Sequence, residues 1–215
     1  MVNTKKTAVL AISGARSYRA SVHISDDNNN RIESQDTLKT LGFVFNSSGD
    51  VSDQVELLKK KFRARIWTLR ELKRHSFTET ELLKVHTTMI RPAVEYSSVI
   101  YHPMLTAEQS SKLEKLQARA LKNVFGYVYS YRKLLDMSGL STLSDRREEA
   151  CKKFAIKTAN NPRFASWFSK RRTGGRRASK LEYAEQNART DCRKNSPLFY
   201  YRHILNDRVK YDKNG

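Results

Sequence analysis

The stretch TLGFVFNSSGDVSDQVELLKKKFRARIWTLREL, residues 40–72, contains the point where the sequence changes from strand-like to helix-like. Before residue 47 it is rich in aromatic and β-branched residues, and SSGD (47–50) is typical of a turn. From there apolar residues recur in steps of three or four: Val51, Val55, Leu58, Phe62, Ile66, Leu69 and Leu72. This period predicts one amphipathic helix of about 22 residues. The chain is therefore expected to be α+β, with a small antiparallel β part followed by a mainly α-helical bundle.

Upstream of this point the sequence predicts strands. KTAVLAIS (6–13) and YRASVHI (18–24) favour strands joined near Gly14, and a further pair is expected near residues 31–33 and 37–45. DDNNN (26–30) is typical of a loop, because Asp and Asn hydrogen-bond their own backbone and tolerate left-handed conformations.

Downstream of it, helix signals predominate. Thr78 with Glu81, and Thr106 with Gln109, have the spacing of capping boxes and predict helices near 79–100 and 107–125. Pro92 is expected to kink or split the first of these near Arg91. Further boundaries are predicted at Gly126 and Gly139, at a Ser144 cap of a helix reaching Ala159, and at a last helix over residues 197–207.

The charge of the chain is strongly positive and unevenly distributed. The net charge is +19, and residues 51–215 hold 35 Lys/Arg against 17 Asp/Glu, whereas residues 1–50 are nearly balanced. A polyanion is the ligand that such a charge favours, with nucleic acid ahead of a membrane surface. No stretch has the length of a membrane span, so no membrane partner is expected.

The helical period places basic residues in two stripes. The first flanks the apolar face of residues 51–72 and contains Lys59, Arg63, Arg70 and Arg74, with Trp67 alongside; the second contains Lys112, Lys115, Arg119 and Lys122. Few acidic neighbours are expected to pair with them. These stripes are either solvated helix faces or contacts to a duplex backbone, and we favour the contacts because counterion release rewards aligned cations.

Six segments resemble, in order, the C-terminal half of the reverse transcriptases of non-LTR retrotransposons, the jockey-like or LINE-type elements. They are NTKKT (3–7), LGFVFN (41–46), RPAVEY (91–96), LEKLQARALKNVFG (113–126), LSTLSDRR (140–147) and NSPLFYYRHILN (195–206). The resemblance implies the end of a palm subdomain over residues 1–49, a helical thumb over 50–170, and a basic linker with a C-terminal helix over 171–215.

The resemblance also implies roles for individual residues. NTKKT is similar to motif D of the palm, with Lys6 near the incoming phosphates and Asn3 and Thr7 as accessory neighbours. TLGFVFN is similar to the primer grip, a β-hairpin, through Leu41, Gly42 and Phe43. A glycine suits that role because a missing Cβ lets a nucleic-acid backbone come close.

The catalytic aspartates of such a polymerase are expected upstream of residue 1. Asp26 and Asp27 mimic the paired carboxylates of polymerases, but they follow the motif D match instead of preceding it and are predicted to form a turn. No metal site and no cofactor are expected in this chain, and Mg²⁺ is expected only in a full-length parent polymerase. Each of the five histidines is expected to be a satisfied structural residue.

The expected function is that of a partial reverse transcriptase that grips an RNA or RNA/DNA template–primer duplex and does not polymerise by itself. Two alternatives remain: a basic RNA-binding or scaffold protein derived from such an element, and a non-functional pseudogene product. Besides nucleic acid, the partner is the rest of a polymerase or a host protein. Cys151 and Cys192 lack metal-ligand spacing and suit a reducing compartment, so an intracellular protein of the nucleus or cytoplasm is expected.

Overall fold

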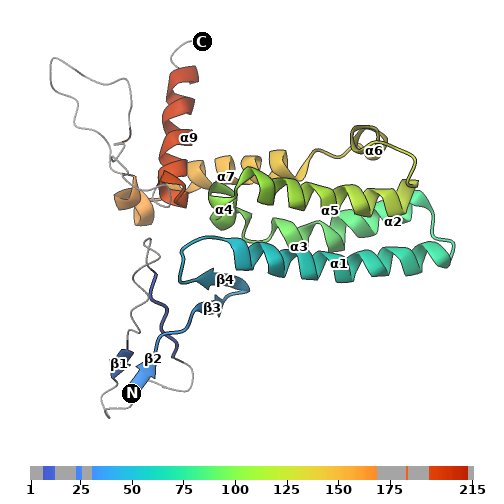
Figure 1. Cartoon of the computed structure of the whole chain (residues 1–215). Coiled ribbons are helices and arrows are strands. Elements are labelled where there is room, and N and C mark those ends of the chain that lie inside the picture. The colour runs from blue at the N-terminus through green and yellow to red at the C-terminus, as the bar shows by residue number, and fades with distance from the viewer. Residues whose placement is uncertain (1–6, 13–22, 26–30, 169–182, 184–193, 213–215) are drawn as a thin grey trace. The chain divides into compact units, whose positions relative to one another are not determined.

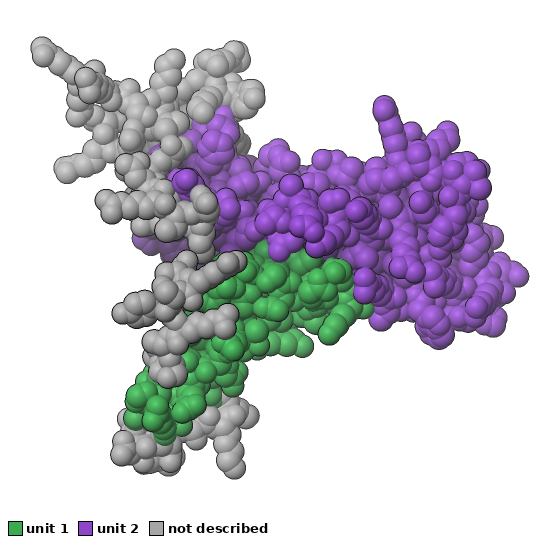
Figure 2. Space-filling model, viewed as in Figure 1, with its two compact units in different colours: residues 1–61 green, residues 62–215 purple. Residues whose placement is uncertain are grey.

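The computed structural model describes residues 7–12, 23–25, 31–168, 183 and 194–212. In this part the chain is mainly helical, with two small antiparallel sheets of two strands each, which confirms the α+β prediction (Figure 1). The chain forms two compact units, residues 1–61 and residues 62–215, and the boundary between them falls inside the first long helix (Figure 2).

The first unit contains the strands. β1 (His23–Ser25) pairs with β2 (Arg31–Glu33), and β3 (Thr37–Thr40) pairs with β4 (Phe43–Asn46). The predicted pairing of residues 31–33 with 37–45 is wrong: residues 31–33 pair with β1, and the segment 37–45, predicted as a single strand, contains the hairpin of β3 and β4. In residues 7–12, the described part of the first predicted strand, Val9 forms an isolated parallel bridge with Ser34. Most of the strand predicted over 18–24 lies outside the described residues.

The β3–β4 turn consists of two residues, Leu41 and Gly42, whose φ angles are 48° and 79°. Two positive φ angles in a two-residue loop are typical of the turn that matches the right-handed twist of paired strands. After β4, the Asn46 amide donates to Asp50 and Asp53 at 2.8 and 2.9 Å, and the Ser52 N–H donates to Asp50 at 2.8 Å. These contacts fix the turn that leads into the first helix.

That helix, α1, spans Ser52–Arg74, two residues longer at its end than the periodic stripe. The stripe from Val51 to Leu69 is buried throughout, as its period predicts, and Leu72 is half-buried.

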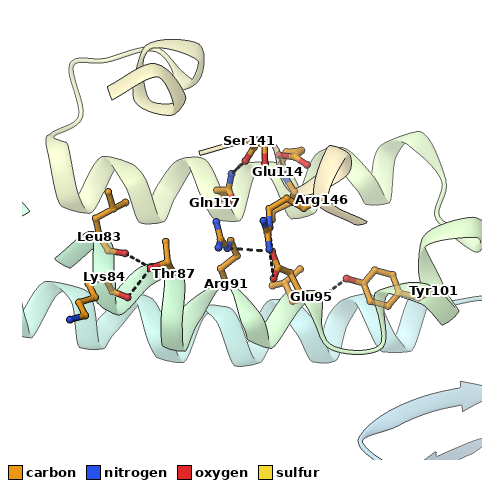
Figure 3. Close-up of polar contacts among 12 residues, drawn as sticks. Leu83, Lys84, Thr87, Arg91, Glu95, Tyr101, Glu114, Gln117, Ser141 and Arg146 are labelled. Carbon is orange, nitrogen blue, oxygen red and sulfur yellow. Dashed lines mark hydrogen bonds and ion pairs between the residues drawn. The ribbon is translucent and has the colours of Figure 1, made fainter. Parts of the chain in front are cut away.

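The second unit continues with α2 (Glu79–Val85), η2 (His86–Ile90), α3 (Pro92–Glu95), α4 (Ser98–Tyr101) and η3 (His102–Met104). The Thr78–Glu81 capping box is present. The expected helix over 79–100 is interrupted, as Pro92 predicts: η2 is a π-turn in which the Arg91 N–H donates to the His86 carbonyl at 2.8 Å, and Pro92 opens α3. The Thr87 hydroxyl is directed at the Leu83 and Lys84 carbonyls next to this turn (Figure 3). The Thr88 hydroxyl donates to the Lys84 carbonyl at 2.8 Å.

The remaining helices are α5 (Ala107–Phe125), α6 (Tyr131–Ser138), α7 (Leu143–Ala159), η4 (Pro162–Trp167) and α9 (Pro197–Asp212). α5 packs against α2, α6 and α7, and α7 packs against α4 and α9 (Figure 1). The second capping box and both glycine boundaries are confirmed, and α9 extends five residues beyond the predicted end at 207. α6 was not predicted.

One predicted cap is wrong. α7 is capped by Thr142, whose side chain accepts from the Asp145 N–H at 3.0 Å, and not by Ser144. The Ser144 N–H is instead directed at the Glu114 carboxylate, at 2.6 Å. The helix therefore starts one residue before the predicted cap, because a carboxylate from a neighbouring helix accepts hydrogen bonds from its first backbone groups.

Candidate nucleic-acid interface

The outer face of α1 carries the first basic stripe. In the part of α1 that belongs to the second unit, Phe62, Ile66 and Leu69 are buried, whereas Arg63, Arg70 and Arg74 are exposed. Trp67 lies among these arginines with 63% of its surface exposed. An indole that is this exposed contributes little to a core, so it is available for a ligand. Lys59, in the first unit, is half-buried.

α5 carries the second basic stripe. Lys112, Lys115 and Arg119 are exposed and Lys122 is half-buried, while the opposite face of the helix is buried through Leu113, Leu116, Ala120 and Val124. This segregation follows from the amphipathic period of residues 107–125 and matches the prediction.

The two stripes approach each other where α1 packs against the end of α5, around Asn123, a contact that we call the α1–α5 seam. Arg70 Nε donates to Asn123 Oδ1 at 3.1 Å, and Asn123 Nδ2 donates to the Arg119 carbonyl one turn earlier, at 2.7 Å. Arg70 of the first stripe thus contacts α5 at Asn123, one helical turn after Arg119 of the second stripe, whose backbone carbonyl accepts from Asn123. The sequence offered no signal for this pairing, because it depends on how two helices 50 residues apart pack.

Lys73 also lies at this seam and was not among the predicted residues. Its Nζ donates to the carbonyls of Asn123 and Val124 at 3.0 and 2.8 Å. These carbonyls belong to the last turn of α5, where a helix lacks intrahelical donors and carries a partial negative charge. Lys73 therefore holds α1 against the end of α5.

Three of the predicted bases have acidic neighbours on their own helices. The ion pairs are Lys59–Glu56 at 2.6 Å, Arg74–Glu71 at 2.8 Å and Lys112–Glu108 at 2.7 Å. Only Lys112–Glu108 has the i,i+4 spacing at which few pairs were expected, and the other two pairs have i,i+3 spacing, which was not predicted. Ion pairs at a protein surface contribute little to stability, so a polyanion can compete for the exposed Arg74 and Lys112. Arg63, Arg119 and Lys122 form no ion pair with any described residue.

Residues 115–135 form an acid-free segment. They contain Lys115, Arg119, Lys122, Arg132 and Lys133 and no Asp or Glu. Arg132 and Lys133, at the start of α6, are exposed and extend the positive surface beyond the predicted stripe. A count of acids along the sequence could have found this segment, although not the helix that presents its last two bases.

Three of the segments that carry the family resemblance meet in a polar network inside the second unit (Figure 3). Arg146 of LSTLSDRR hydrogen-bonds Glu95 of RPAVEY through Nε and, at 3.1 Å, through Nη2, and Arg91 pairs with the same carboxylate at 3.3 Å. The hydrogen bond to Glu95 raises the pKa of Arg146. Glu114 of the α5 segment lies 3.8 Å from the buried Arg147. These charges join helices within the second unit: Arg147 is buried, and the others are only partly exposed.

The residues that resemble a primer grip lie at the β3–β4 turn. Leu41 is 88% exposed at its tip, and Phe43 is buried against Phe45 with 4.6 Å between ring centroids. Gly42 has a local reason to be glycine, because its φ of 79° disfavours other residues. Of the motif D-like residues, Thr7 is exposed, and Lys6 and Asn3 lie outside the described residues.

The described residues contain no group of three or more His, Cys, Asp or Glu side chains that could hold a metal ion. Asp26 and Asp27 lie outside them. Among the helices of the described part of the chain, none is both long enough and apolar enough to cross a membrane.

Comparison of the chain with protein-family models, with curated proteins and with solved structures gave no match.

Proposed function

We propose that the chain is the palm-end and thumb part of a non-LTR retrotransposon reverse transcriptase, and that its helical unit grips the phosphate backbone of an RNA or RNA/DNA duplex. The six collinear segments support the family, and the excess of bases after residue 50 supports the ligand. Duplex backbones carry one charge per ~1.7 Å, so aligned cations gain free energy by releasing counterions.

One observation carries the proposal. The α1 and α5 stripes border a single seam, joined by the Arg70–Asn123 hydrogen bond and by the Asn123 contact to the Arg119 carbonyl. Two rigid helices can present cations at fixed separation, which suits a regular duplex better than a flexible strand. Because phosphates carry no base identity, binding should be nearly independent of sequence.

The salt dependence of duplex binding tests this proposal. In the variant Lys115→Gln/Arg119→Gln/Lys122→Gln, three cations are lost from the exposed side of α5. The slope of log K against log salt should become shallower by up to about 2.7, at ~0.9 per phosphate contact. Fluorescence anisotropy of a labelled RNA/DNA duplex over a salt series measures this slope.

A matched control removes the same charge elsewhere. Lys152→Gln/Lys153→Gln/Lys157→Gln takes three exposed cations from α7, two of which pair with Glu148 and Glu149. This variant should retain most of the slope. Equal losses in the two variants would mean that only net charge matters, and an unchanged slope in the α5 variant would exclude the seam as a contact surface.

A second test concerns catalysis. Residues 1–215, supplied with primer–template, nucleotides and Mg²⁺, should incorporate no nucleotide, because the resemblance places the catalytic aspartates before residue 1. Primer extension on a gel measures this. Template-dependent extension that Asp27→Ala abolishes would instead assign catalysis to Asp26 and Asp27.

A further inference from the structure

The loop between α5 and α6 (Figure 1) contains three large residues in succession whose side chains are exposed. Gly126, with φ of 110°, ends α5, and Ser130 caps α6. Between them Tyr127, Val128 and Tyr129 are 60%, 93% and 39% exposed. Large apolar surface in water is unfavourable, so three such residues in a row at a helix junction indicate a surface that is covered by a ligand.

Tyr131, only two residues further on, has the opposite environment. Its hydroxyl donates to Glu114 at 2.6 Å and accepts from Gln117 Nε2 at 3.1 Å, so it anchors α6 to α5. The attachment of α6 to α5 therefore does not depend on the exposed rings of Tyr127 and Tyr129 alone.

The loop is physically joined to the basic seam. The Tyr127 hydroxyl donates to Asn123 Oδ1 at 3.0 Å, the same oxygen that accepts from Arg70 Nε at 3.1 Å. The exposed Tyr127 ring therefore lies next to the α1–α5 seam.

The sequence on both sides of the loop contains bases and no acids. Lys122 precedes it and Arg132 and Lys133 follow it, within the acid-free segment 115–135. Arg132 and Lys133 occupy the first turn of α6, where the helix dipole disfavours cations. An anionic ligand would remove this unfavourable interaction.

We propose that the Tyr127–Tyr129 loop stacks unpaired bases of a nucleic-acid strand that continues beyond the duplex held at the α1–α5 seam. Tyrosine rings stack on any base without reading its identity, and the flanking cations neutralise the phosphates of that strand. A protein partner is disfavoured, because protein interfaces are depleted in lysine at their centres, whereas here cations flank the rings on both sides. This inference rests on the proposed function and adds a single-stranded extension to its ligand.

The test uses the full chain and two probes: a blunt RNA/DNA duplex, and the same duplex with a short single-stranded extension that carries a fluorescent adenine analogue. The extended probe should bind about tenfold more tightly than the blunt one, the gain expected of a base–aromatic stack. The emission of the analogue should fall on binding, because stacking quenches it.

Three variants test whether the aromatic rings of Tyr127 and Tyr129 are themselves required for binding the extension. Tyr127→Leu/Tyr129→Leu should lose the preference for the extension and the quenching, while its affinity for the blunt duplex equals that of Tyr127→Phe/Tyr129→Phe, which lacks the same two hydroxyls. Tyr127→Phe/Tyr129→Phe keeps the rings and should keep both effects. Tyr96→Leu, which removes an exposed tyrosine after α3, should behave as the parent. Thermal melting checks that each variant folds.

The outcomes distinguish the two proposals. Salt-dependent binding of the blunt duplex, with no preference for the extension, would overturn the stacking inference alone. A preference that persists in the leucine variant would also overturn it, and would show that the cations suffice. If neither probe binds, the proposed function fails as well, and the exposed loop becomes a candidate surface for a protein partner.

Discussion

At the scale of single residues, His86 is the side chain whose environment departs most from expectation. It is fully buried in η2, with its ring edge-on to Phe62 at 6.4 Å between centroids. Neither ring nitrogen has a hydrogen-bond partner among the described residues, so it is not the satisfied structural histidine that the sequence suggested. Burial, reinforced by the Arg91 charge, lowers its pKa to about 4.

Stability should therefore depend on pH through His86. The folded-state pKa lies below the unfolded value of 6.5, so the unfolded chain binds a proton first. The free energy of unfolding has its full value above pH 6.5. It decreases by on the order of 2 kcal/mol as the pH falls toward 4, because the unfolded chain then binds a proton that buried His86 does not. His86→Phe should remove most of this loss, and His102, whose pKa burial also lowers, is expected to supply the remainder. Denaturant unfolding at a series of pH values measures the loss.

Two other titratable residues, His75 and Asp50, help to assign this pH dependence to His86. His75 is exposed, so His75→Phe should leave the pH profile of the parent unchanged. Asp50 has a pKa of about 2. Partial burial opposes the ionisation of its carboxyl group, but hydrogen bonds from Ser52, Asn46 and Ser48 together favour it more strongly. Asp50 therefore affects the stability only at lower pH. A parent protein equally stable at pH 7 and pH 4.5 would contradict the role of His86.

At the scale of helices, Glu114 connects three elements (Figure 3). From α5 its carboxylate accepts from the Leu143 and Ser144 N–H groups at the start of α7, at 3.2 and 2.6 Å, and from the Tyr131 hydroxyl of α6. A negative charge at a helix N-terminus is stabilising, and here it is partly shielded from water.

Replacing this carboxylate should loosen the bundle. Glu114→Gln keeps the size but removes the charge, and should lower the free energy of unfolding by about 1–3 kcal/mol. Glu108→Gln, at the exposed start of the same helix, should leave it nearly unchanged. Urea unfolding followed by circular dichroism measures both, and equal effects would mean that Glu114 does not organise α7.

At the scale of the whole molecule, the last helix completes a core of the second unit. Cys151 and Ala155 of α7 are buried with Phe168 and with Tyr201 and Leu205 of α9. The Tyr201 hydroxyl donates to the Val99 carbonyl, so α9 also contacts α4. A helix near the end of the chain thus shields residues fifty positions earlier.

The reactivity of Cys151 should report this packing. Burial raises the pKa of its thiol to about 11, so at neutral pH it holds about 100-fold less thiolate than an ordinary cysteine. In a Cys192→Ser background, a thiol reagent should modify the full chain slowly. Removing residues 195–215 should accelerate modification strongly while helical circular dichroism persists. Fast modification of the full chain would show that α9 does not cover Cys151.

Much of the helical fold was predictable because its signals are local. The period from Val51 to Leu69 places those residues inside, and the Thr78 and Thr106 capping boxes and the Gly126 boundary require only neighbouring residues. Pro92 similarly predicted the break in the helix expected over residues 79–100. α6 was missed because Tyr131–Ser138 is too short for a periodic signal, and the Ser144 cap was wrong because a distant Glu114 takes its N–H.

The sequence by itself therefore determined the α+β class, the two basic stripes and the excess of positive charge, since composition and period are properties of contiguous residues. Only the tertiary structure decided that Arg70 and Arg119 border one seam, that Lys73 is held by the end of α5, and that the Tyr127 ring adjoins them. The physical reason is that the Arg70 and Lys73 contacts join residues 50 to 53 positions apart, which helix packing brings together and no local pattern specifies. The Tyr127 contact is local, but only the packing of α1 on α5 makes its acceptor, Asn123, part of the seam.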